Sequence, residues 1–133
     1  MKTKGDIETL RVEALAKFLD EKDLDRAQSL IDHEDYLVLT DDEADEKVRE
    51  EILNSIWAFN SNFIASHSEL DAETIRIIQD AKYEDANEPL KRLINDLDHF
   101  IEDAVSSDGR GHFLASYDGH ENEEGQFYIY RRN

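Results

Sequence analysis

Cysteine is absent from the 133-residue chain, which excludes disulfides, cysteine-bound zinc and thiol nucleophiles. One proline and five glycines leave no proline-rich or glycine-rich linker, so we expect a single domain over residues 1–133. No apolar run reaches 18 residues, and the start "MKTKGDIETL" lacks the apolar stretch of a signal peptide. These absences predict a cytoplasmic protein.

Basic residues are scarce: 15 Lys and Arg stand against 33 Asp and Glu, a formal net charge of −18. Proteins that bind nucleic-acid phosphates or anionic lipid need Lys and Arg at the contact, so we expect neither nucleic acid nor a membrane as a direct partner. The acids are spread along the chain, but residues 110–133 carry only −1. The negative charge therefore lies mainly on the segments predicted to be helical.

Apolar residues at three- and four-residue steps predict helices within 6–32, the second of them starting at Asp23 or Asp25, and one long helix over 41–66. Further helices are predicted within 68–108. The first of these starts near Ser68 or Asp71, and the last runs from "NEPL" through 105 with Gly109 as its C-cap. The run "YLVLT" over 36–40 is rich in β-branched and aromatic residues and predicts a strand. A β-hairpin is predicted over 112–131, with its strands at 112–117 and 126–131. The expected fold is α+β, a mainly helical single domain with a small antiparallel three-stranded sheet.

The stretch "YLVLTDDEADEKVREE" runs from that strand into a block with seven acids and two bases. "TDDE" is a capping box, in which the Thr40 hydroxyl accepts from the Glu43 backbone N–H and the Glu43 carboxylate accepts from the Thr40 N–H. Asp41 and Asp42 in the first turn favour the positive end of the helix dipole by about 0.3–1 kcal/mol each. Capping therefore explains the first three acids and leaves the later ones unexplained.

Asp42, Glu46 and Glu50 form a row at four-residue spacing that contains no base. Like charges at this spacing cost a few tenths of a kcal/mol per pair, so helix stability does not account for the row. Beside it, two favourable pairs are predicted at the same spacing, Glu43–Lys47 and Asp45–Arg49. An apolar patch or second buried face is predicted to continue the row through Leu53, Trp57 and Ile64.

Five histidines raise the question of a metal, but none has the H-x₃-H or H-E-x-x-H spacing of a zinc site. Four side chains near the predicted hairpin turn could converge, although a solvated turn explains them more simply: His112, Asp118, His120 and Glu121. No nucleophile elbow or phosphate-binding loop is present. We expect no metal, no cofactor and no enzymatic activity.

Three stretches resemble a family of small uncharacterised proteins encoded by phages and related mobile elements: "YLVLTDDEADE", "WAFN" and "GRGHFLASYDGHENEEGQFYIYRRN". The resemblance covers roughly half of the chain, and the segments before 36 and over 68–108 contribute less to it. It implies a phage context and the cytosol of a host cell. Since the family has no assigned activity, the resemblance identifies no catalytic residue.

Two functions remain open. The first is a DNA-mimic inhibitor that occupies the basic groove of a host nuclease or other nucleic-acid-binding protein, as anti-restriction and anti-CRISPR proteins do. Its partner-binding residues are predicted to be Asp42, Glu46, Glu50, Trp57, Glu69, Glu73, Asp80, Asp96, Glu102 and Asp103. The second is an interaction or assembly module, possibly a homodimer, whose apolar contact surface comprises Leu53, Trp57, Ile64 and the strand tyrosines.

Overall fold

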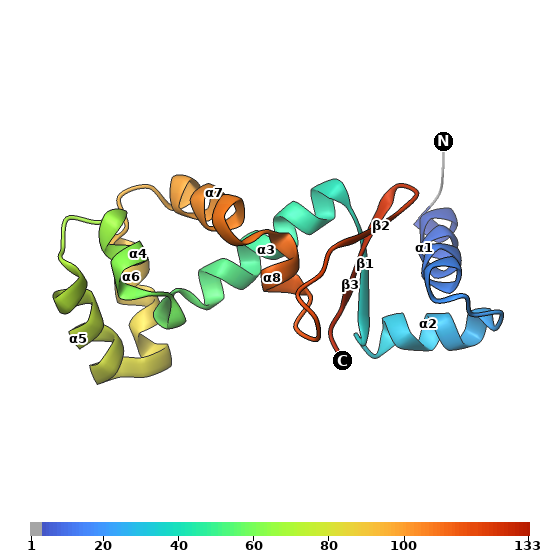
Figure 1. Ribbon diagram of the computed structural model, residues 1–133, viewed down its shortest axis with the longest axis horizontal. Coiled ribbons are helices and arrows are strands. Elements are labelled where there is room, and N and C mark those ends of the chain that lie inside the picture. The colour runs from blue at the N-terminus through green and yellow to red at the C-terminus, as the bar shows by residue number, and fades with distance from the viewer. Residues whose placement is uncertain (1–3) are drawn as a thin grey trace. The chain divides into compact units, whose positions relative to one another are not determined.

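The computed structural model describes residues 4–133, with side chains from Asp6 onward, and groups them into two compact units (Figure 1). The sheet unit comprises the chain up to Val48 and from Arg110 to the end, and the helical unit comprises Arg49–Gly109. The fold is mainly helical α+β with one three-stranded antiparallel sheet, which confirms the predicted fold class. The expectation of a single domain over 1–133 stays a prediction.

The sheet has the order β1-β3-β2, so the last strand in the sequence is the central one. Strand β1 spans Tyr36–Thr40, as predicted, and pairs antiparallel with β3, Phe127–Arg131. Strand β2, Asn122–Glu124, pairs with the other edge of β3. In this register Val38 and Asn122 both face Ile129.

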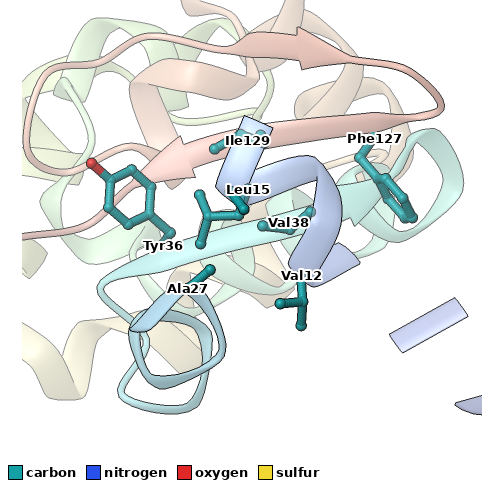
Figure 2. Close-up of a cluster of buried hydrophobic side chains, with 8 residues drawn as sticks. Val12, Leu15, Ala27, Tyr36, Val38, Phe127 and Ile129 are labelled. Carbon is teal, nitrogen blue, oxygen red and sulfur yellow. The ribbon is translucent and has the colours of Figure 1, made fainter. Parts of the chain in front are cut away.

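One face of the sheet is covered by α1, Lys4–Leu19, and α2, Leu24–Asp32. Figure 2 shows apolar side chains of both helices directed toward those of β1 and β3. The buried cluster consists of Val12, Leu15, Ala16, Ala27, Tyr36, Val38, Phe127 and Ile129. Asp23 begins α2, because its carboxylate accepts from the N–H groups of the first turn, and it is one of the two caps predicted there.

The opposite face of β3 carries Tyr128 and Tyr130, because side chains alternate along a strand. Tyr130 is fully buried, while Tyr128 is half-buried. Both faces of the central strand therefore contribute to the core.

Helix α3, Asp41–Asn54, begins in the sheet unit and ends in the helical unit. The prediction of one helix over 41–66 is wrong, because α3 is followed by a short 3₁₀ turn, η1, Ile56–Ala58, and then by α4, Ser61–Ser66. The two amides that stabilise the break come from distant parts of the chain. Asn87 donates to the Leu53 carbonyl at 2.6 Å, and Gln79 donates to the Phe59 carbonyl at 2.7 Å.

The remaining helical segments are α5, Ala72–Lys82; η2, Tyr83–Ala86; α6, Asn87–Leu93; and α7, Leu97–Asp108. Asp71, one of the two predicted helix starts, caps α5 with its side chain, and Gly109, the predicted C-cap, ends α7 with a positive φ of 84°. The continuous helix expected through 105 is interrupted after α6, since Ile94 pairs with Ser68 in a β-bridge. Buried residues of the helical unit include Ile52, Ile56, Ile64, Ile75, Leu90 and Phe100.

The predicted strand at 112–117 is wrong: a short helix, α8, spans Arg110–Leu114, and β2 provides the third strand. Buried positions here are Gly111, Leu114 and Ala115, which is helical rather than alternating spacing. A Cβ atom at Gly111 would lie 2.5 Å from the Gly119 carbonyl oxygen, so glycine allows this close backbone approach. Within the described part of the chain, no helix has both the length and the apolar character needed to cross a membrane.

Candidate acidic binding surface

The start of α3 contains the predicted capping box. The Glu43 N–H donates to the Thr40 hydroxyl at 3.3 Å, and the Thr40 N–H donates to a Glu43 carboxylate oxygen at 2.9 Å. Both donors would otherwise be unsatisfied at a helix N-terminus. The junction between β1 and α3 is therefore fixed by adjacent residues of the sequence.

Glu43 also forms a two-point contact with Arg11 of α1. The Arg11 Nη1 and Nη2 atoms lie 2.5 and 2.7 Å from the two Glu43 carboxylate oxygens, and Nη1 donates to the Val38 carbonyl at 2.9 Å. Only 12% of the Arg11 side chain is exposed. The hydrogen bonds from Arg11 lower the pKa of Glu43 below its ordinary value and keep the carboxylate charged.

A second arginine, Arg110 of α8, holds two other acids of the same helix. Its Nη1 atom donates to Asp41 at 2.8 Å and to Asp45 at 2.9 Å, while Nε donates to Glu121 at 2.8 Å. The guanidinium also lies over the Tyr128 ring, 4.8 Å from its centroid. Burial lowers the pKa of Arg110, but the hydrogen bonds that it donates to these carboxylates raise it by more, so the pKa is above its ordinary value.

Tyr130 extends this network into the core, since its hydroxyl donates to Glu121. Burial raises the pKa of the Tyr130 phenol, and the hydrogen bond to the Glu121 carboxylate raises it further. Asp41, Asp45 and Glu121 thus each have the Arg110 guanidinium as a partner of opposite sign. The arginine–acid network connects α3, α8 and β3 around one guanidinium.

Three acids at the start of α3 therefore serve the fold: Asp41, Glu43 and Asp45. Sequence reasoning expected Glu43 and Asp45 to pair with Lys47 and Arg49, but their partners in the structure are the two arginines. Arg49 pairs with Asp98 at 2.6 Å. Sequence-local reasoning could not find Arg11 and Arg110, because they lie 32 and 65 or more residues away from these acids.

Asp42 and Glu46 differ from their neighbours. Both side chains are exposed, and no cation in the described part of the chain lies within ion-pair distance of either. Glu50, one turn further along α3, is also exposed but has an interaction of its own. The two acids are four residues apart on α3. Because Arg11 and Arg110 hold the N-terminal turns of this helix, the backbone that carries both side chains is fixed in position.

Asp42 also lies in a cluster with Asp41 and Asp45, in which one carboxylate oxygen of each lies within 4.8 Å of the others. All three are exposed, and Arg110 already binds two of them. A cation would have to compete with the guanidinium for the same oxygens. We therefore interpret the cluster as part of the arginine–acid network.

In the helical unit, three of the predicted partner-binding acids have roles in the fold. Asp96 caps α7 by accepting from the His99 N–H at 3.2 Å, Glu69 accepts from the Asn95 amide, and Asp103 pairs with His67. Three others are exposed and have no cation among the described residues: Glu73, Asp80 and Glu102.

Trp57 is half-buried, and its backbone N–H donates to the Asn87 side chain at 3.2 Å. Ile64 is fully buried and Leu53 half-buried, so the apolar contact surface expected from these three residues does not form as predicted. Two of the strand tyrosines assigned to that surface, Tyr36 and Tyr130, are also buried. Large exposed apolar side chains in the helical unit are found on α5 and η2.

The pair of His67 and Asp103 was not predicted. His67 Nε2 lies 2.7 Å from Asp103 Oδ2, and the histidine side chain is only 10% exposed. The pair lines an open hollow of about 450 Å³ together with Ser66, Asn95, Asp96 and His99. The two residues are 36 positions apart, so no local signal in the sequence points to their contact.

Searches of protein-family models, curated protein sequences and solved structures find no match to this chain.

Proposed function

We propose that this chain is a non-enzymatic binding protein of the cytosol that uses its acidic surface to occupy the basic groove of a nucleic-acid-binding protein. In a phage setting the partner is a host nuclease or another defence protein, of the kind blocked by anti-restriction and anti-CRISPR inhibitors. The observation that carries the proposal is the exposure of Asp42 and Glu46, which lack a cation among the described residues beside three acids that have one.

The two acids are suited to this role because of their spacing and their support. Carboxylates four residues apart on a helix stand about 6 Å from each other, which is comparable with the phosphate spacing along a nucleic-acid strand. A rigid helix start reduces the conformational entropy that is lost on binding. Because the whole chain carries −18, its field attracts and steers a basic partner before contact.

The helical unit supplies a comparable charge. It contains 14 acidic and 5 basic residues, so its formal net charge is −9. Glu73, Asp80 and Glu102 have exposed carboxylates there that form no ion pair with a described residue. We infer that these acids add to the attraction of a basic partner, while Asp42 and Glu46 form the most rigid part of the contact.

The test compares two double variants with the same net charge. Asp42→Asn with Glu46→Gln removes the proposed contact, and Glu13→Gln with Glu123→Gln removes two other exposed acids that have no partner among the described residues. Each variant is used to recover proteins from host lysate, and each recovered protein is then purified and its affinity measured as salt is raised. We expect the wild type and the control to bind a nuclease or other nucleic-acid-binding protein, with affinity that falls as salt rises.

The contact variant should lose at least about tenfold in affinity for that purified partner, which corresponds to about 1.4 kcal/mol. Equal losses in both variants would mean that net charge alone matters and that Asp42 and Glu46 form no site. Recovery of only non-basic partners, or binding that is insensitive to salt, would contradict the proposal.

A further inference from the structure

Tyr83 and Ile77 are the most exposed of the large hydrophobic side chains in the described chain, at 70% and 61%. Ile77 lies in the middle of α5, and Tyr83 is the first residue of η2, directly after that helix. They are six positions apart, so the helical rise keeps their Cα atoms within about 10 Å of each other. Neither side chain contributes much to the core, and an aromatic ring this exposed has no packing role in the fold.

The backbone at Tyr83 adds a second observation. Its φ of 51° and ψ of −125° lie in a region that side-chain-bearing residues rarely adopt and that glycine adopts readily. Glycine is also the residue most often found just beyond a helix C-terminus. A tyrosine here is therefore less favourable for folding than a glycine would be, so the ring is not explained by the stability of the turn.

Charged residues are frequent in the segment that carries these two side chains. The segment Ala72–Ala86 carries four acids and two bases, the acids being Glu73, Asp80, Glu84 and Asp85. None of the four has an ion-pair partner among the described residues. Exposed acids next to an exposed ring and an aliphatic side chain favour a partner that is both basic and apolar.

Two arginines of this chain lie over tyrosine rings, which indicates that a guanidinium is a suitable cation for the exposed ring of Tyr83. Arg131 lies over Tyr117 with its guanidinium carbon 3.7 Å from the ring centroid, and Arg110 lies over Tyr128 while it binds three carboxylates. Arginine stacks on aromatic rings and pairs with carboxylates through the same planar group. Tyr83 has the ring and the nearby acids, but no arginine among the described residues lies over it.

We propose that the segment formed by α5 and η2 is a docking surface for an arginine-bearing, amphipathic segment of a protein partner. A guanidinium of the partner stacks on Tyr83 and pairs with Glu84 or Asp85, and an apolar side chain contacts Ile77. A second copy of this chain is disfavoured as the occupant, because two molecules of −18 repel each other. Docking here is independent of the acidic row on α3.

The test uses a fluorescent amphipathic peptide of arginine and leucine as the probe. Matched peptides replace every arginine by lysine or every leucine by serine. We expect the arginine–leucine peptide to bind more tightly than either control, and amide shifts in NMR spectra to concentrate on residues 77–85. Tyr83→Phe should retain binding, because the stack needs the ring and not the hydroxyl. Tyr83→Gly and Ile77→Gln should each weaken it, together by about tenfold.

Tyr83→Gly keeps the proposal falsifiable because glycine suits this backbone, so the variant should fold at least as stably as the wild type. Leu24→Gln, which changes an exposed apolar residue of α2, is the matched control and should leave binding unchanged. Equal binding of Tyr83→Gly and wild type would overturn the proposal, as would equal affinity for the lysine or serine peptides. Self-association in sedimentation experiments that Ile77→Gln abolishes would also overturn it, since the occupant would then be a second copy.

Discussion

The two terminal guanidinium nitrogens of Arg11 each donate to one carboxylate oxygen of Glu43, at 2.5 and 2.7 Å. The same carboxylate closes the capping box with Thr40 at 2.9 Å. The Glu43 side chain thus accepts a capping hydrogen bond at the start of α3. It also connects this helix to Arg11 of α1, 32 positions earlier in the sequence. We therefore expect replacement of Glu43 to lower the stability of the fold.

Replacing Arg11 by Met keeps the apolar stem but removes the charge. We expect a loss of about 1–2 kcal/mol in the free energy of unfolding, because charge-assisted hydrogen bonds are lost while the Glu43 carboxylate stays part-exposed to water. Urea denaturation measures the change. Arg26→Met is the control: it removes an exposed ion pair of 3.5 Å with Glu21 and should cost no more than about 0.5 kcal/mol.

The contribution of Glu43 depends on pH. Arg11 lowers its pKa in the folded state below the ordinary value of 4.5, so the folded protein binds fewer protons than the unfolded chain just below that pH. The stabilisation is complete above pH 4.5 and is lost as the pH falls through the lowered value. The stability difference between wild type and Glu43→Gln should therefore be constant near neutrality and shrink on acidification. A difference that grows below pH 4.5 would contradict this assignment.

Tyr130 should control the alkaline limit of stability. Burial and the bond to Glu121 raise its pKa in the folded state, whereas the unfolded phenol ionises near its ordinary value of 10.0. Stability is thus complete below pH 10 and decreases as the pH rises further, because only the unfolded chain loses the proton. We expect the melting temperature of the wild type to fall more steeply above pH 10 than that of Tyr130→Phe. Parallel curves would show that this tyrosine does not set the limit.

Gly111→Ala should be the most damaging glycine substitution in the sheet unit. Its Cβ would lie 2.5 Å from the Gly119 carbonyl oxygen and 2.9 Å from the Glu121 nitrogen, and both are backbone atoms that cannot rotate away. We expect a loss of about 1–3 kcal/mol, typical of overpacking in a filled core. Gly125→Asn is the control, since that site is open and asparagine tolerates its positive φ of 62°. Equal stability of the two variants would contradict the close approach of α8.

Salt should stabilise the protein. With 33 acids and 15 bases, at least 18 acids have no cation of their own, and their repulsion is screened over about 8–10 Å at physiological ionic strength. We expect the melting temperature to rise between low and physiological salt. A fall would mean that internal ion pairs dominate the surface electrostatics, and it would remove the main physical support for binding through exposed acids.

The parts of this fold that could be predicted depend on neighbours in the sequence. The strand at Tyr36–Thr40, the capping box of Thr40 and Glu43, and the caps at Asp71 and Gly109 each involve residues within four positions of one another. The same locality explains why three- and four-residue spacing identified most of the helices.

The parts that could not be predicted depend on distant residues. The break after α3 is stabilised by Asn87 and Gln79, and the charge of Asp41 and Asp45 is balanced by Arg110. The segment "HFLASY" was mistaken for a strand because its apolar residues fit both periods, whereas in the structure it continues a helix whose Gly111 packs closely against the backbone near Gly119. Spacing in the sequence predicted where the acids of the candidate surface lie on α3. It did not predict which of them form ion pairs and which stay exposed.

The place of β3 at the centre of the sheet has a consequence for synthesis on the ribosome. The strand that pairs with both β1 and β2 follows Arg49–Gly109 in the sequence, so it is made only after the whole helical unit. The sheet therefore cannot form when α1, α2 and β1 emerge, because β3 has not yet been made. The residues of the helical unit, Arg49–Gly109, emerge in one continuous stretch. During that interval the apolar faces of α1 and β1 lack their partner strand, which is when a nascent chain of this kind is most exposed to misassembly.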